Sequence, residues 1–180
     1  MATLKVPVGP ADHSQGPADA PVTLVEYGDY ECPHCGRAYP IVKALQKKLG
    51  KRLRFVFRNF PLREIHPKAE VAAETAEFAA THDKFWDMHD LIFENQNSLS
   101  EQMLEELARR LTLDEQALRD ALRSGAFAER VRRDFSGGVR SGVNGTPTFF
   151  INSQRHDGDF ELETLLQTIN RAASNHKSTT

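Results

Sequence analysis

Residues 22–35 read VTLVEYGDYECPHC and join an apolar run to two cysteines. The run at 22–27 has the length and composition of a buried strand. Cys32 and Cys35 follow it and come directly before a helical pattern of apolar residues at 41–49. A lone C-x-x-C between a strand and a helix is typical of a reactive dithiol rather than of a structural bridge. The stretch therefore predicts a strand–turn–helix unit that carries a redox pair.

The predicted helix gives the two thiols different roles. Cys32 falls at the helix N-terminus, where unpaired N–H groups and the positive end of the dipole favour a thiolate. His34 adds a donor beside the sulfur, and such surroundings lower a cysteine pKa from ~8.5 to about 3.5–7.5. Pro33 stiffens the turn. Cys35 lies one turn deeper and is shielded, so we expect Cys32 to be the nucleophile and Cys35 the resolving thiol.

Two structural interpretations of the cysteines are weaker. A zinc site would need two more ligands, and His82 and His89 lie further apart than the usual histidine pair of such a site. A disulfide across so short a loop would constrain the unfolded chain little. The chain has two cysteines in all, which indicates reactivity. We expect His66, His82, His89 and His156 at the surface or at helix ends.

The composition bounds the class of protein. The chain has 180 residues, of which 39% are hydrophobic and 27% charged, and a formal net charge of −2. It is long enough for one domain, or for one domain with an insertion. Because binding by counterion release needs a basic face, neither nucleic acid nor a membrane is expected as a partner. Arg130, Arg132 and Arg133, which stand beside Glu129 and Asp134, are expected to form a solvated helix face.

The first twenty residues hold no apolar stretch of signal-peptide length, and no later segment is apolar over a membrane-spanning length. On these grounds we expect a cytoplasmic protein, or a periplasmic one if a signal peptide has been removed.

The predicted elements follow the order β-α-β, a helical block, then β-β-α. A β-α-β unit gives parallel strands and a terminal hairpin gives antiparallel ones, so the sheet should be mixed. The expected parts are an extended N-terminal arm at 1–20, an α/β domain made of 21–64 and 143–174, a helical insertion at 65–142, and a disordered tail at 175–180.

Local signals set the details of these elements. We expect a helix at 33–49 that Gly50 closes, a second strand at 53–57, and a hairpin loop at Asn152-Ser153. In the helical block, Glu70, Glu74 and Glu77 form one polar stripe. The other signals there are an N-cap at Ser100, a capping box at Thr112-x-x-Glu115, a helix end at Gly125, and a loosening of the last helix at Gly137-Gly138.

Two features outside the turn point to the same chemistry. Glu26 lies on the buried strand that leads to the cysteines, where a carboxyl group could relay protons to Cys35; pairing with Lys43 is the equal alternative. Gly145-Thr146-Pro147 precedes a strand, and a proline at the first residue of a strand indicates a fixed turn.

Together these motifs resemble the DsbA-type branch of the thioredoxin superfamily. The resemblance covers roughly residues 10–173 and rests on VEYGDYECPHC at 25–35, FRNFPL at 57–62, FWDMH at 85–89 and GTPTF at 145–149. It implies an α/β thioredoxin-like fold with a central mixed sheet and an all-helical insertion that serves as a lid.

The resemblance also implies site residues. Pro147 would be cis and packed against the active-site disulfide, and Thr146 and Pro147 would bind an extended substrate by strand addition. Glu26 matches a family position held by an acidic residue. Thr146 departs from the valine of the DsbA archetype and is similar to disulfide isomerases and reductases.

The expected function is thiol–disulfide exchange with protein or peptide substrates, without a metal or organic cofactor. Glutathione or a redox protein would serve as the redox partner. A C-P-H-C pair favours an oxidant, whereas a cytoplasmic location favours a reductant, so the oxidase, isomerase and reductase directions stay open. The alternatives are a glutathione-dependent transferase or isomerase and a non-catalytic peptide-binding or holdase module.

Overall fold

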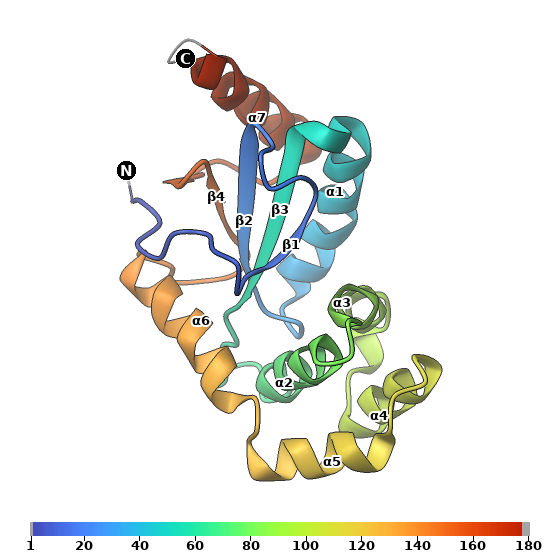
Figure 1. The fold of residues 1–180 in the computed structure, drawn as a ribbon. Coiled ribbons are helices and arrows are strands. Elements are labelled where there is room, and N and C mark those ends of the chain that lie inside the picture. Colours follow the sequence, from blue (N-terminus) through green and yellow to red (C-terminus); the bar gives the residue numbers. More distant parts are fainter. Residues whose placement is uncertain (1, 178–180) are drawn as a thin grey trace. The chain divides into compact units, whose positions relative to one another are not determined.

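The computed structural model describes residues 2–177. Internal contacts divide the chain into two compact units. The first unit comprises the residues up to Gly28, 37–58, and the residues from Gly137 onward. The second unit comprises 29–36 and 59–136. Figure 1 shows the elements of both units in chain order.

The first unit is built on a mixed sheet. Its five strands within residues 2–177 are β1 (His13–Gln15), β2 (Val22–Gly28), β3 (Leu53–Asn59), β4 (Thr148–Ile151) and β5 (Gln154–Arg155), in the spatial order β1-β3-β2-β4-β5. β1 pairs antiparallel with β3, as do β2 with β4 and β4 with β5. The remaining neighbours, β3 and β2, are the parallel pair of the mixed sheet. The predicted α/β class is confirmed.

The central strand β2 is apolar because it is covered on both faces. Val22, Leu24 and Tyr27 are fully buried, as expected for a strand in the middle of a sheet. Helix α7 (Leu162–Lys177) packs against β2 and β4. Helix α1 (Pro33–Leu49) follows β2, and Gly50 after it has a φ of 52°. The helix predicted at 33–49 with a glycine stop is therefore confirmed.

The N-terminal arm is held to the sheet by a buried arginine. Arg58 on β3 is 3% exposed and donates to both carboxylate oxygens of Asp12 at 2.8 and 3.0 Å. It also donates to the carbonyls of Val6 and Pro7 and to the hydroxyl of Tyr27. Burial lowers the pKa of this guanidinium, but its bonds to Asp12 and Tyr27 more than offset that and raise it. The arm contributes strand β1, which the sequence pattern does not indicate.

Two predictions concern the C-terminal segment, the hairpin at 152–153 and the disordered tail at 175–180, and only the first is confirmed. Asn152 and Ser153 have φ angles of 45° and 69°, as a type I′ hairpin turn requires, so the predicted hairpin is confirmed. α7 continues to Lys177. The prediction of a disordered tail from 175 is thus wrong for 175–177, and 178–180 lie outside the described residues.

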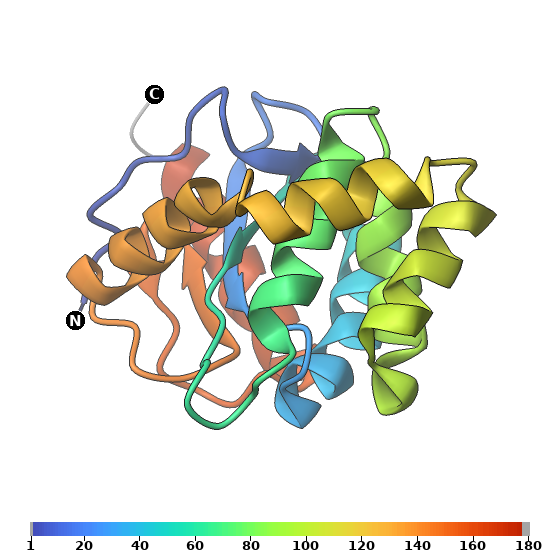
Figure 2. The same cartoon turned by 90° about the horizontal axis from the view of Figure 1, so that it is seen from below.

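The second unit is helical. Its elements are α2 (Ala69–Ala80), α3 (Phe85–Glu94), the 3-10 turn η2 (Gln96–Ser98), α4 (Glu101–Arg110), α5 (Glu115–Ser124) and α6 (Ala128–Arg140), the last entering the first unit at Gly137. α2 contacts α3, α4 and α5 (Figure 2). Because it is surrounded by other helices, α2 needs small apolar residues, and its alanines 69, 72, 73, 76 and 79 are buried.

The start of α5 differs from the predicted capping box. Asp114 accepts a hydrogen bond from the Ala117 N–H at 2.8 Å and is the N-cap. Thr112 instead has a φ of 59°, a left-handed conformation, whereas an N-cap typically has extended backbone angles. Gly125, with a φ of 65°, ends the helix as predicted.

Of two other predictions about helices, one is confirmed and one is wrong. Ser100 accepts the Met103 N–H at 3.1 Å and caps α4 as predicted. The expected loosening at Gly137-Gly138 does not occur, because α6 continues to Arg140.

The predicted polar stripe of α2 turns inward. Glu74 and Glu77 are only 8% and 4% exposed. The Asn59 side-chain amide donates to Glu77 at 2.7 Å, and Arg130 lies 3.6 Å from the same carboxylate and bonds Asp134. Burial raises the pKa of Asp134, against the opposing effect of Arg130. The predicted solvated arginine face is therefore wrong at Arg130.

Within residues 2–177, no helix combines the length and the apolar character that crossing a bilayer requires.

Candidate functional site

The turn that follows β2 is organised by one carboxylate. Asp29 is 1% exposed. Its Oδ1 accepts the backbone N–H groups of Glu31 at 2.8 Å and Cys32 at 3.1 Å. Its Oδ2 accepts the Leu62 N–H at 2.8 Å and forms a hydrogen bond with His66 Nδ1 at 2.9 Å. Four partners on one buried side chain fix the backbone that presents the first cysteine.

The two cysteines lie at the start of α1. Cys32 is 3% exposed and Cys35 is fully buried, whereas Pro33 and His34 between them are exposed. The backbone N–H of Asp29 donates to Cys35 Sγ at 3.4 Å. An N–H donor favours a sulfur anion, as the helix N-terminus does for Cys32. The shielded position predicted for Cys35 is confirmed.

A glutamine from η2 holds the same turn from another side. The Gln96 side-chain amide donates to the carbonyls of Tyr30 at 2.8 Å and Cys32 at 2.9 Å. It lies so close to the helix that a Cβ added at Gly36 would come within 2.1 Å of its Oε1. A larger residue at position 36 would therefore displace the Gln96 side chain from its bonds to the turn. Both the amide and the carbonyl of Cys32 are anchored.

Two histidines belong to the surroundings of the turn. His89 is 3% exposed and its Nδ1 lies 3.0 Å from the Tyr30 hydroxyl, while His66 bonds the Asp29 carboxylate. The prediction that these histidines lie at the surface or at helix ends is wrong for His89, which is buried within α3; His66 is half-buried just before α2. Each is drawn inward by a polar partner far away in the sequence.

The remaining predicted site residues lie in the first unit. Glu26 on β2 is 3% exposed and stands opposite Phe149 of β4. Thr146 and Pro147 precede β4, and the peptide bond between them is cis, as the resemblance implies. The structure thus groups Glu26 with the strand that follows Thr146 and Pro147, and it groups the four residues of the C-P-H-C turn in the second unit.

Sequence reasoning missed three residues that anchor the turn. Asp29 had a readable signal, since an aspartate three positions before Cys32 has the spacing of a capping residue. His66 and Gln96 had none, because their contacts join segments separated by 37 and 64 positions.

Comparison with known proteins agrees with this geometry. A family model described as thioredoxin matches residues 9–171. The chain belongs to the thioredoxin family. It matches the crystal structure of oxidised BdbD from Bacillus subtilis with 26% identity, a TM-score of 0.86 and coverage of 96% of this chain and 98% of that one. A thioredoxin-like oxidoreductase from Silicibacter pomeroyi matches with 25% identity, a TM-score of 0.78 and coverage of 92% and 94%.

Within the thioredoxin family, the fold is DsbA-like. The alpha-DsbA1 structure from Wolbachia pipientis has a TM-score of 0.84 at 20% identity, over 98% of this chain and 97% of that one, which supports the fold alone. The chain therefore has the DsbA-like oxidoreductase fold with Cys32 and Cys35 in a C-x-x-C arrangement.

Curated relatives add a different context. A Na(+)/H(+) antiporter NhaA 1 from Salinispora arenicola is 45% identical over 170 residues, which are 94% of this chain and 26% of that protein. One from Mycobacterium sp. (strain KMS) is 39% identical over 93% of this chain and 28% of that protein. The chain thus spans about a quarter of the length of these relatives.

Proposed function

We propose that this protein is a thiol–disulfide oxidoreductase that exchanges disulfides with protein or peptide substrates through Cys32 and Cys35. The observation that carries the proposal is the anchored turn. Asp29 and Gln96 fix the backbone of Cys32 on both sides, and the Asp29 N–H bonds the sulfur of Cys35. Such an arrangement stabilises the thiolate of Cys32 in the first step of the reaction and that of Cys35 in the second, without a cofactor.

The reaction proceeds by two displacements. The Cys32 thiolate attacks one sulfur of a substrate disulfide, forms a mixed disulfide, and expels the other substrate sulfur as a thiolate. Cys35, as a thiolate, then attacks the sulfur of Cys32 and releases the second substrate thiolate. The substrate gains two electrons and the protein ends with a Cys32–Cys35 disulfide. The reverse sequence oxidises a substrate dithiol, and glutathione or a redox protein restores the starting state.

Four further residues have proposed roles in this scheme. His34, exposed two positions after Cys32, favours the thiolate. Glu26 relays the proton that Cys35 loses. Thr146 and Pro147 bind an extended substrate segment by strand addition ahead of β4.

The setting of the reaction is also part of the proposal. We infer that the antiporter relatives carry an equivalent dithiol unit within their longer chains. The cytoplasmic location stays a prediction, since the names of these relatives place the dithiol on neither side of a membrane.

A trapping experiment tests the proposal. Cys35→Ser should accumulate mixed disulfides with substrate proteins through Cys32, because the resolving thiol is gone while the nucleophile remains. Cys32→Ser, the matched control, should accumulate none. Non-reducing electrophoresis and mass spectrometry of the full chain read the result. Trapping by Cys32→Ser alone would reverse the roles, and full activity without Cys32 would favour a non-catalytic holdase.

The direction of electron flow follows from one further measurement. The equilibrium redox potential of the pair against glutathione distinguishes a reductant near −270 mV from an oxidant near −120 mV, the approximate values for a thioredoxin and a DsbA.

A further inference from the structure

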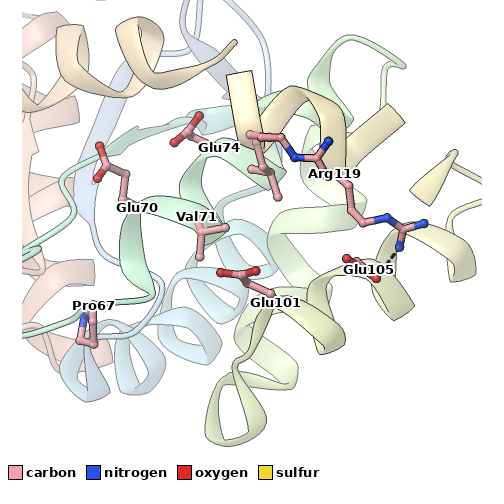
Figure 3. Close-up of a pocket in the computed structure, with 9 residues that line it drawn as sticks. Pro67, Glu70, Val71, Glu74, Glu101, Glu105 and Arg119 are labelled. Atoms are coloured by element: carbon pink, nitrogen blue, oxygen red, sulfur yellow. Dashed lines mark hydrogen bonds and ion pairs between the residues drawn. The ribbon is translucent and has the colours of Figure 1, made fainter. Parts of the chain in front are cut away.

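A pocket of about 480 Å³ opens in the second unit among α2, α4 and α5. Figure 3 shows Glu74 and Val71 from α2 and Glu101 from α4 on its wall, with the ion pair of Arg119 and Glu105 to one side. Its volume lies in the range of sites that bind small groups. Apolar side chains meet carboxylates here, so the pocket suits a ligand with an apolar stem and a cationic end.

One carboxylate on this wall is incompletely bonded. Glu74 is 8% exposed, and its Oε2 is buried without a hydrogen-bond partner among the described residues. Burial, followed by the nearby charge of Glu70, raises its pKa, while a bond from the Phe127 N–H and the charge of Arg132 lower it. A buried carboxylate with one unbonded oxygen costs free energy, and the charge of a cation bound beside it would recover part of that cost.

The other charges of the pocket are mostly neutralised. The ion pairs are Arg119 with Glu105 at 2.7 Å, Arg63 with Glu70 at 3.1 Å, and Arg123 with Asp120 at 3.3 Å. Glu101, in the first turn of α4, has no ion-pair partner within residues 2–177. The helix dipole accounts for part of its placement. Two carboxylates, Glu74 and Glu101, are therefore left to meet a cation.

The pocket adjoins the segment that anchors the active-site turn. Pro67 lines it. The two neighbours of Pro67 are both bonded to the turn: His66 to Asp29 at 2.9 Å, and the Lys68 N–H to the Glu31 carboxylate at 2.6 Å. Because Glu31 directly precedes Cys32, a polypeptide attacked by that thiol passes close to the segment at 66–68.

We propose that this pocket binds a lysine side chain of the protein substrate whose disulfide Cys32 attacks. The inference rests on the proposed function and names its substrate class. The aliphatic stem lies against Val71 and Leu122, and the ammonium group reaches Glu74 and Glu101. Lysine fits better than arginine, because a guanidinium prefers both oxygens of a carboxylate and the Oε2 of Glu74 is buried. Nor do three metal-ligating side chains converge anywhere in residues 2–177.

Disulfide-linked peptides test the inference. One lysine is moved position by position along each side of the cysteine, and matched sets carry norleucine or arginine at the same position. The kcat/KM for exchange is measured with the full-length protein. We expect a lysine preference of about tenfold over norleucine at one or two positions, expressed in KM, as for one charge-assisted hydrogen bond.

Variants locate the effect. Glu74→Gln and Glu101→Gln should each reduce the lysine preference severalfold while norleucine peptides keep their kcat/KM. Glu106→Gln is the matched control, since this exposed residue lies on α4 outside the pocket and removes the same charge. Glu101 is itself exposed, so its variant tests the site even where Glu74→Gln perturbs folding.

The outcomes separate the two proposals. Equal kcat/KM for lysine and norleucine peptides, an arginine preference above that for lysine, or an equal loss in Glu106→Gln would each overturn the lysine site and leave disulfide exchange standing. If no peptide is exchanged at all, the proposed function itself fails.

Discussion

At the scale of single residues, the most consequential side chain of the site is the carboxylate of Asp29. It satisfies three backbone N–H groups and one histidine while it is itself buried. Without this carboxylate several buried N–H groups would have no acceptor. A buried donor without an acceptor costs more free energy than a typical hydrogen bond contributes.

Asp29→Ala should therefore lower the free energy of unfolding by about 3 kcal/mol or more, because it strands several N–H donors at once. It should also slow disulfide exchange, because the backbone of Cys32 loses its anchor. Denaturant titration and peptide exchange measure the two effects. Asp19→Ala, at an exposed position, should change stability by less than about 0.5 kcal/mol. Equal stability of the two variants would contradict the role of Asp29.

Glu74 gives a pH-dependent prediction. Burial raises its pKa above the ordinary 4.5, so the folded protein holds this proton to higher pH than the unfolded chain does. The group therefore destabilises the fold as pH rises from 4.5 through the raised value. Glu74→Gln should increase the free energy of unfolding relative to the parent at pH 7, and the difference should vanish below about pH 4. Denaturant titrations at both pH values check it, and Glu106→Gln should show no such dependence.

At the scale of elements, two residues could cap the start of α5: Asp114, or Thr112 as the first residue of a capping box. Asp114 accepts the Ala117 N–H, whereas Thr112 is left-handed and exposed. Asp114→Ala should cost about 1 kcal/mol of stability. Thr112→Gly should stabilise the protein, since a β-branched residue is strained at positive φ. Thermal or denaturant unfolding measures both. A loss of stability in Thr112→Gly similar to that in Asp114→Ala would instead support the Thr112 capping box.

Elements with a local cause were predictable from the sequence. The helix at 33–49, the strands beginning at 22 and 53, and the hairpin at Asn152-Ser153 depend on periodicity and turn chemistry within a few residues. Strand β1 was not predictable in this way, because its order comes from pairing with β3, which lies far along the chain. The three pairs are His13 with Phe57, Ser14 with Val56 and Gln15 with Phe55.

The polar residues of the second unit were harder to place for the same reason. The spacing of Glu70, Glu74 and Glu77 identifies a face of α2, but it does not say whether that face meets water. Asn59 and Arg130 decide this for Glu77, and both are remote in the sequence. The C-P-H-C pair was predictable because its chemistry is local, whereas its anchors His66 and Gln96 were not.

At the scale of the whole molecule, the redox state should control stability. In the reduced protein, the start of α1 and the Asp29 N–H favour sulfur anions. In the oxidised protein, a disulfide across two residues adds little chain-entropy stabilisation. The free energy of unfolding of the reduced form should therefore be at least as large as that of the oxidised form near neutral pH. His34→Ala should reduce the difference between these two free energies.

Denaturant titrations of both redox forms measure that difference. Lys47→Ala, an exposed change at the other end of α1, should leave it unaltered. An oxidised form several kcal/mol more stable, and insensitive to His34→Ala, would favour a thioredoxin-like reductant instead.

The arrangement of the sheet has a consequence for association between chains. Its two outermost strands are very short, three residues in β1 and two in β5. A short edge strand offers few free backbone groups to a neighbouring chain. Behind β1 lies β3, whose run LRFVFRN is buried and aromatic, a composition prone to intermolecular strand pairing when exposed. Arg58 holds the arm that supplies β1, and β1 pairs with the edge of this run. We therefore expect the N-terminal arm to protect the protein from aggregation.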